Sequence, residues 1–162
     1  MSETSNNSAR SDAFRLLNYR PRSVSEIQKR LMEKYDKDTV EITVSSLLES
    51  ELLDDQKFAI WWTESRVRQK LLSSSMIRRE LVQKGVSTSE IQIALNSVDD
   101  NINAHKLAEK LGHTVSKNDL IQFKRKLYGK ITRRGFSSSL ASAAIEKTCD
   151  SFIDSKEISL EW

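Results

Sequence analysis

The sequence predicts an all-α protein built from tandem three-helix repeats, and three observations carry this prediction. The 162 residues include only four glycines and one proline, whereas a β-rich domain needs turn residues about every ten positions. Apolar residues recur at spacings of three and four, which is the period of an amphipathic helix. The chain also repeats itself at an offset of about fifty residues, which is typical of a repeat architecture.

The repeat is visible in single residues of the second helix of each unit and of the turn after it. The residues that correspond are Ser23, Ile27, Leu31 and Tyr35 in the first unit, Ser73, Ile77, Leu81 and Gly85 in the second, and Leu127, Ile131 and Gly135 in the third. We therefore expect a disordered tail over residues 1–10, three-helix repeats over 11–53, 54–98 and 99–154, and a C-terminal tail over 155–162.

Apolar periodicity and capping motifs locate the individual helices. The expected core includes, among others, Phe14, Leu17, Leu48, Phe58, Trp62, Leu81, Leu107, Leu120, Phe123, Leu127 and Ile145. The spacings from Ser23 to Glu26, Asp38 to Glu41 and Ser87 to Glu90 fit a capping box, in which two side chains satisfy free backbone groups at a helix start. Gly85 and Gly135 are expected to end helices in a left-handed conformation, and Tyr35 takes that place in the first repeat.

Residues with catalytic chemistry do not form a recognisable motif. The glycines make no phosphate-binding loop, and His105 and His113 lack a metal-ligand pattern around them. Cys149 is expected to be a buried apolar residue, and Asp54–Asp55 is better explained by helix capping than by a metal site. We expect a protein that is not an enzyme and has no cofactor and no metal.

Charge is distributed unevenly along the chain. Residues 1–55 hold eight Lys and Arg against eleven Asp and Glu, whereas residues 101–150 hold ten against four. This polarity indicates an anionic partner for the second and third repeats, although a solvated helix face is the simpler alternative. The expected contact residues are Arg66, Arg68, Lys70, Arg78, Arg79, Lys84, Lys124, Arg125, Lys126, Lys130, Arg133 and Arg134.

Trp61 and Trp62 are adjacent, so on a helix their side chains point about 100° apart. Trp62 continues the apolar face of Phe58 and Ala59 and is expected in the core. Trp61 is then either a filler between two repeats or an exposed anchor for a partner.

Several of these segments resemble one known family, RecX, the regulatory protein of the bacterial recombinase RecA. The most specific stretch is Leu53-Asp54-Asp55-Gln56-Lys57-Phe58-Ala59, followed by Trp62 and Arg66. Ile77-Arg78-Arg79-Glu80-Leu81 with Lys84-Gly85-Val86, and Arg22-Ser23 with Glu26 and Leu31, are similar to further family segments. The chain departs from the family pattern at Leu71–Ser75 and at Tyr35, where family members commonly have glycine.

The resemblance covers about residues 11–150 and implies an elongated, curved array of three repeats in the cytoplasm. It implies a monomer that binds the RecA–DNA filament in its groove and inhibits recombination, ATP hydrolysis and co-protease activity. By the same resemblance the protein takes part in homologous recombination, the SOS response and regulation of DNA repair.

Weak DNA binding without sequence preference is a further expectation, and a membrane partner is not expected, because no apolar run approaches a transmembrane length. The alternative function is a DNA-binding protein with helix-turn-helix-like units. Its reading helix, about residues 87–98, contains Gln92 and Asn96 but no Lys or Arg, which disfavours it.

Overall fold

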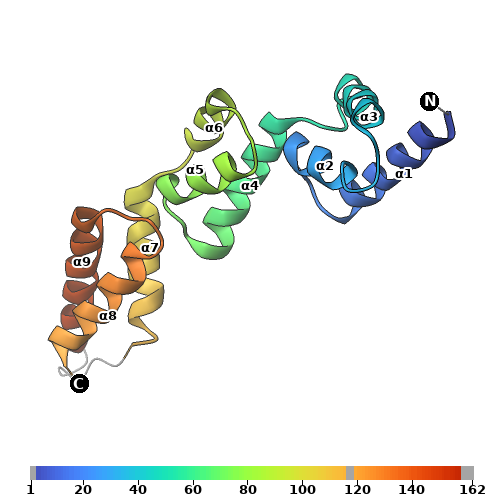
Figure 1. Ribbon diagram of the computed structural model, residues 1–162. Coiled ribbons are helices and arrows are strands. Elements are labelled where there is room, and N and C mark those ends of the chain that lie inside the picture. Colours follow the sequence, from blue (N-terminus) through green and yellow to red (C-terminus); the bar gives the residue numbers. More distant parts are fainter. Residues whose placement is uncertain (1–2, 116–118, 158–162) are drawn as a thin grey trace. The chain divides into compact units, whose positions relative to one another are not determined.

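The computed structural model describes residues 3–115 and 119–157, and within these ranges it contains nine α-helices and no strand (Figure 1). The all-α class predicted from the sequence is therefore confirmed. The helices are α1 (Glu3–Tyr19), α2 (Val24–Leu31), α3 (Lys37–Glu49), α4 (Asp55–Lys70), α5 (Ser74–Gln83), α6 (Thr88–Leu95), α7 (Asp100–Gly112), α8 (Leu120–Thr132) and α9 (Ser138–Glu157).

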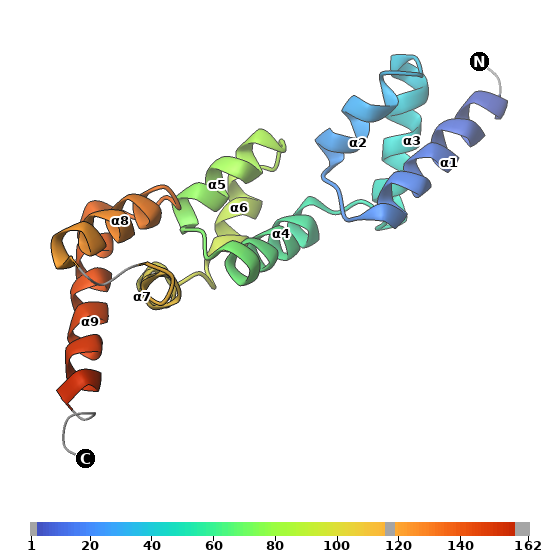
Figure 2. The ribbon, with the colours of Figure 1, turned by 90° about the horizontal axis from the view of Figure 1, so that it is seen from below.

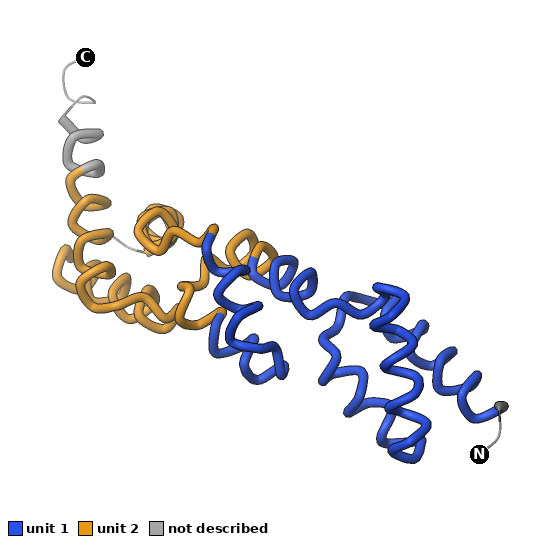
Figure 3. Tube along the Cα trace, turned by 90° about the horizontal axis from the view of Figure 1, so that it is seen from above, with its two compact units in different colours: residues 1–63, 78–96 blue, residues 64–77, 97–162 orange. Residues whose placement is uncertain are grey.

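The chain divides into two compact units, which are coloured separately in Figure 3. Unit 1 comprises residues 1–63 and 78–96, and unit 2 comprises residues 64–77 and 97–162. The division runs through α4 and α5, so each of these helices contributes to both units. The two compact units therefore do not coincide with the three predicted repeats, because the residues of the middle repeat are divided between the two units.

In unit 1, α1, α2 and α3 pack together around a small apolar core (Figure 2). The periodicity of α2 puts Ile27 and Leu31 one turn apart on the same face, and both are buried. The core of these three helices consists of Ala13, Ile27, Leu31, Val40, Val44, Leu47 and Leu53, with Phe14, Leu16 and Leu17 packed against it.

In unit 2, α7, α8 and α9 form the second bundle, in which α9 packs against both other helices. Phe123, Leu127 and Ile131 line one face of α8 at spacings of four residues, and all are buried. They meet Ala104, Leu107, Ala108, Val115, Phe136, Ala141, Ala144, Ile145 and Cys149. The buried Cys149 agrees with its predicted role as a small apolar residue.

The N-terminal residues are the main correction to the predicted boundaries. Residues 3–10, expected to be disordered, belong to α1. The reason is tertiary, because Ala9 and Ala13 lie one turn apart and are both fully buried, which stabilises a polar segment that would be a weak helix alone. At the other end, α9 extends to Glu157, and residues 158–162 lie outside the described residues.

Two of the three predicted capping boxes are confirmed. The side chains of Ser23 and Ser87 accept hydrogen bonds from the backbone N–H groups of Glu26 and Glu90, and these glutamates reach back to the capping residues. The third prediction was wrong, because Asp36 caps α3 by accepting from Thr39 N–H at 2.9 Å. The helix therefore begins two residues earlier than Asp38 would place it.

Two apolar residues predicted in the core lie at the surface instead. Leu48 is 44% exposed and Leu120 is 53% exposed. Leu120 is the first residue of α8. Spacing identifies a helical face correctly, but it does not show where along the helix the packing partner ends.

The two turn glycines have a positive φ, 77° at Gly85 and 91° at Gly135, as expected for left-handed helix ends. Both also lie against the second helix of the preceding repeat. A Cβ atom at Gly85 would lie 2.5 Å from Ser25 Cβ, and one at Gly135 would lie 2.4 Å from Ser73 Oγ. Glycine is therefore needed twice over, for the backbone conformation and for the close approach.

Tyr35 stands in the first repeat where the later repeats have a turn glycine, and it does not have the positive φ of Gly85 and Gly135. Its hydroxyl donates to Asp12 Oδ2 at 3.1 Å and ties the turn to α1.

We expect Gly85→Ala and Gly135→Ala each to lower the free energy of unfolding by about 2 kcal/mol or more, from left-handed strain and steric overlap together. Urea unfolding followed by helical circular dichroism measures this change. Gly129→Ala is the matched control, because it lies within α8 and a Cβ there meets nothing within 4 Å. The control should be stabilised by up to about 1 kcal/mol, and equal stability of all three variants would contradict a specific need for glycine at the two turns.

Candidate partner-binding surface

The twelve predicted basic contact residues fall into both units. Nine lie in unit 2, and Arg78, Arg79 and Lys84 lie in unit 1. Their role as contact residues stays a prediction. Within each unit, the structure separates basic side chains that serve the fold from those that point to solvent.

The clearest set of solvent-facing cations lies on α8. Because Phe123 and Leu127 bury one face of this helix, Lys124, Arg125 and Lys126 are turned outward, and all three are exposed. None of these three forms an ion pair with a described residue of the chain. We call Lys124, Arg125 and Lys126 the α8 cation cluster.

A hollow of about 280 Å³ lies beside this cluster in unit 2. It is lined by Lys124, Arg125, Tyr128, Ser142, Ile145 and Glu146. Tyr128 is 38% exposed, and at the start of the same helix Ile121 is 80% exposed. The surface of α8 thus combines positive charge with accessible apolar area, and sequence analysis missed the apolar part.

Two of the other basic residues near the C-terminal end of α8, Arg133 and Arg134, have local partners. Arg133 donates through Nε to Gly129 O at 2.9 Å, within its own helix. Arg134 donates to the backbone carbonyl of Lys70, and Lys130 is only partly exposed. Arg134 is therefore a poor candidate for a partner contact, because it holds the end of α4.

In the second repeat, Arg68, Lys70 and Arg79 are exposed, whereas Arg66 and Arg78 are partly buried. Arg78 donates to Gln92 Oε1 at 2.8 Å. This contact occupies one of the two α6 side chains that the helix-turn-helix alternative needs for reading bases. Helix α6 itself contains no Lys or Arg, so it has little that could bind phosphate.

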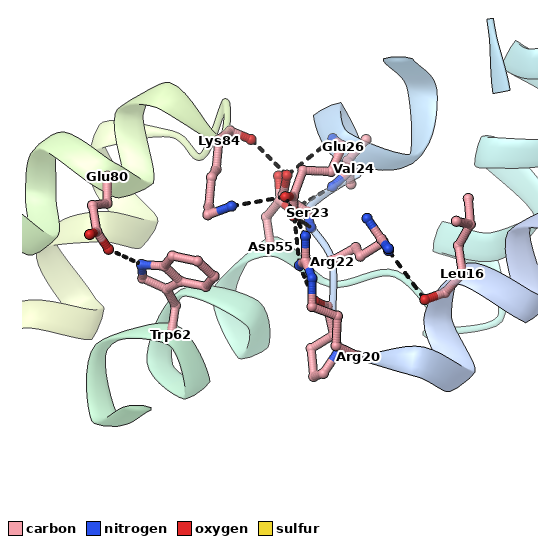
Figure 4. Close-up of polar contacts among 11 residues, drawn as sticks. Leu16, Arg20, Arg22, Ser23, Val24, Glu26, Asp55, Trp62, Glu80 and Lys84 are labelled. Carbon is pink, nitrogen blue, oxygen red and sulfur yellow. Dashed lines mark hydrogen bonds and ion pairs between the residues drawn. The ribbon is translucent and has the colours of Figure 1, made fainter. Parts of the chain in front are cut away.

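Lys84 is the basic residue whose predicted role changes most. Its Nζ lies 2.8 Å from Glu26 Oε1 and 4.0 Å from the centre of the Trp62 ring, as the close-up in Figure 4 shows. Its side chain is only 17% exposed. Lys84 therefore joins the second repeat to the first, and it is a poor candidate for a partner contact.

Glu26 is the centre of this contact between α2 and the turn after α5. It accepts from Arg20 at 2.8 Å and from Lys84 at 2.8 Å, and from the N–H of Ser23 at 3.2 Å. Burial by itself would raise the pKa of Glu26. Its bonds to Arg20, Lys84 and Ser23 outweigh burial and lower the pKa to about 2.

We call the contacts between the first and second repeats around Glu26 the first joint, and two further hydrogen bonds complete it. Ser23 Oγ donates to Lys84 O at 2.7 Å, and the N–H of Val24, the first residue of α2, donates to Asp55 Oδ1 at 2.9 Å. Asp54 meanwhile caps its own helix by accepting from Lys57 N–H at 2.8 Å. In the Asp54–Asp55 pair, the first residue caps α4 and the second caps the helix of the preceding repeat.

The same arrangement recurs in unit 2 between the second and third repeats, and we call it the second joint. The N–H of Ser73 donates to Arg134 O at 3.0 Å, and Ser75 Oγ donates to Gly135 O at 2.9 Å. Ser74, the first residue of α5, donates through its N–H to Asp100 Oδ1 and through Oγ to Asp100 Oδ2, both at 2.7 Å. Asp99 caps α7 by accepting from Ile102 N–H at 3.0 Å.

The two joints explain why an Asp-Asp pair opens both the second and the third repeat. The pair Asp54–Asp55 was expected to cap a helix, which is confirmed for Asp54. The contacts of Asp55 and Asp100 with the preceding repeat were not expected. The recurrence of an Asp-Asp pair was the signal available, but only the fold brings these residues together.

Trp62 is 8% exposed, as predicted, and its Nε1 donates to Glu80 Oε2 at 2.8 Å. Trp61 is partly exposed and lines a second hollow in unit 1. The described residues contain no group of three or more His, Cys, Asp and Glu that could hold a metal ion. None of the described helices is long and apolar enough to span a membrane.

Comparison with known families adds independent information. The model of the first three-helix domain of RecX matches residues 9–47, and the model of the second three-helix domain matches residues 54–95. These ranges contain α1 to α3 and α4 to α6, apart from a few terminal residues.

Individual relatives extend the similarity over most of the chain. Regulatory protein RecX of Bacillus cytotoxicus is 30% identical over 151 residues, which cover 90% of this chain and 55% of the relative. The protein of the same name from Corynebacterium efficiens is 29% identical, covering 88% and 72%. This chain therefore spans only part of each relative's length.

Solved structures agree with this relationship. A crystal structure of regulatory protein RecX has a TM-score of 0.73 and 28% sequence identity, covering 88% of this chain and 72% of the other. The crystal structure of RecX from Lactobacillus salivarius has a TM-score of 0.76, covering 91% and 98%. Its sequence identity is 18%, so it supports the fold alone.

We expect Glu26→Gln to lower the free energy of unfolding by about 2 kcal/mol at neutral pH, because it weakens charge-assisted bonds to Lys84 and Arg20. The folded-state pKa of Glu26 lies below the ordinary value of 4.5. Its stabilisation is therefore present above about pH 4.5 and is lost as the pH falls towards 2. Urea unfolding between pH 7 and pH 2.5 should show a steeper loss for the wild type than for the variant.

Glu33→Gln is the control for this experiment, because Glu33 forms an exposed ion pair with Arg30 on the same repeat. Such a pair contributes about 0–1 kcal/mol. If the two variants unfold with the same pH dependence, the joint around Glu26 does not stabilise the fold.

Proposed function

Since this chain belongs to the RecX family of regulatory proteins, we propose that it binds the RecA–DNA filament and restrains RecA recombinase. Inhibition of ATP hydrolysis and of co-protease activity would follow from the same binding, and the cellular role would be regulation of DNA repair. The observation that carries the proposal is the match of the models of two RecX domains to residues 9–47 and 54–95. These residues include the contacts of Glu26 and Asp55 between the first and second repeats.

The α8 cation cluster supports a large anionic partner. Three adjacent exposed cations without ion pairs raise the association rate with an acidic or phosphate-bearing surface, and this effect weakens with salt. A filament of protein on DNA presents phosphates and acidic side chains repeatedly. Several weak contacts along it add up through effective concentration.

A regulatory role by binding needs no reaction centre in this chain. The relatives are named regulatory proteins, and the exposed cations of α8 and the hollow beside Trp61 support contact with a partner. We therefore propose a role without catalysis, with the protein acting as a monomer in the cytoplasm. The activity of the full-length relatives is extended to this shorter chain as part of the same proposal.

A direct test is the effect of the purified protein on ATP hydrolysis by RecA on single-stranded DNA. Added in amounts well below those of RecA, the protein should reduce the rate strongly. Full ATPase activity together with tight binding to one duplex sequence would contradict the proposal. That result would favour the helix-turn-helix alternative.

The contribution of the α8 cation cluster can be tested by charge reversal. Arg125→Glu with Lys126→Glu should raise the concentration needed for half-inhibition about tenfold, because it replaces attraction by repulsion at the contact surface. Arg134 is left intact, since it holds the carbonyl of Lys70.

Lys106→Glu with Lys110→Glu makes the same charge change on exposed positions of α7 and serves as the control. It should shift half-inhibition by less than the α8 pair does. Equal shifts for the two pairs would show that only net charge matters and would assign the α8 face to solvent.

A further inference from the structure

A hollow in unit 1 lies where the chain enters α2 and α4. Its volume is about 240 Å³. It is lined by Leu17, Pro21, Arg22, Glu51, Leu52, Asp54, Lys57, Phe58 and Trp61.

The volume favours a single large side chain as the occupant. A cavity of about 150 Å³ accommodates benzene, whereas sites for cofactor-sized ligands occupy about 300–1,000 Å³. The hollow is therefore large enough for an aromatic or branched aliphatic side chain and small for a nucleotide.

One wall of the hollow is aromatic, and its Trp61 ring packs against neighbouring rings of α4. The ring of Trp61 lies 6.2 Å from that of Phe58 and 6.1 Å from that of Trp62, between ring centres. Leu52, on the rim, is 46% exposed. Its N–H donates to Leu47 O at 2.9 Å, and Glu51 before it is left-handed with φ 54°. The rim backbone is thus fixed before any partner arrives.

Arg22 supplies a charge without a counter-ion. Its Nε donates to Leu16 O at 3.2 Å, and among the described residues it has no ion pair. In Figure 4 the dashed line from Arg22 runs to the backbone carbonyl of Leu16. Burial and the nearby Arg20 lower the pKa of Arg22 and outweigh the opposite effect of Glu26, so an incoming carboxylate would stabilise the charge. The planar guanidinium binds carboxylates through two parallel hydrogen bonds.

The acidic residues on the rim distinguish this hollow from a nucleic-acid site. Glu51 and Asp54 lie 3.5 Å and 3.3 Å from Lys57 Nζ, so the only other cation of the lining is already matched. A run of phosphates would meet two carboxylates here. A protein segment with one carboxylate beside an apolar side chain meets Arg22 and the aromatic wall together.

We propose that this hollow is a docking site for a protein partner, which inserts one large apolar side chain against Trp61 and places a neighbouring carboxylate on Arg22. The proposal rests on the proposed function in that the partner is the protein component of the filament. Apolar anchors in small pockets are where binding energy concentrates in protein interfaces.

The test measures the affinity of the full chain for RecA filaments assembled on immobilised single-stranded DNA. Trp61→Ala and Arg22→Gln should each weaken binding about tenfold. Leu52→Glu places a charge on an exposed rim position and should weaken binding by a similar factor while circular dichroism shows unchanged helicity. This variant keeps the test valid if Trp61→Ala proves unstable.

Matched controls lie in the same unit. Ile60→Glu makes the same change as Leu52→Glu at a residue that is 38% exposed and does not line the hollow, and Arg15→Gln removes an exposed arginine. Both should change affinity less than twofold.

If the hollow variants bind like their controls, the docking site is wrong and the proposed function stands. If the wild type and both controls fail to bind filaments, the proposed function and this inference fail together. Two other occupants are examined in parallel. Self-association of the free protein that Leu52→Glu abolishes, or binding to bare single-stranded DNA that it weakens, would overturn the proposal in favour of a second copy or a nucleic acid.

Discussion

The carboxylate that reaches back from one repeat to the preceding helix is the contact on which the architecture of this chain depends. The first backbone N–H groups of a helix have no partner within the helix. Asp55 supplies that partner for α2, and Asp100 supplies it for α5. The adjoining turns can approach only because Gly85 and Gly135 lack a Cβ atom. Each repeat therefore completes the one before it, and the stability of neighbours is coupled.

The joints also divide the basic residues into two classes that look alike in the sequence. Lys84 and Arg134 each precede a turn glycine, and each binds a residue of the preceding repeat. Lys84 pairs with Glu26, and Arg134 donates to the carbonyl of Lys70. Lys124, Arg125 and Lys126 have the same chemistry but face solvent. A cation in an ion pair with a half-buried glutamate contributes to the fold, and one without a partner contributes to the long-range attraction of an anionic surface. The charge of a segment therefore overstates the charge that a partner meets.

The α8 cation cluster and the hollow at Trp61 suit different parts of a binding event. Exposed charge acts over about a Debye length and governs mainly the rate of encounter. An apolar pocket acts only on contact and governs mainly how long the complex lasts. A regulator of a long assembly benefits from both, because many weak sites are first found and one specific contact then holds the complex in register.

Helical periodicity, the scarcity of glycine and proline, and the fifty-residue repeat determined by themselves the all-α class and most of the buried residues, because local spacing decides which face of a helix is apolar. The residues around Leu53–Ala59 likewise indicated the family. Only the tertiary structure decided that Ala9 draws residues 3–10 into α1, that Leu120 is exposed and that Lys84 pairs with Glu26, 58 positions away in the chain. These outcomes depend on which distant surfaces meet. The turn at Tyr35 gives the physical reason most plainly, since its hydroxyl is bound by Asp12 of α1, 23 positions away. Neighbours in space are set by the fold and not by spacing along the chain.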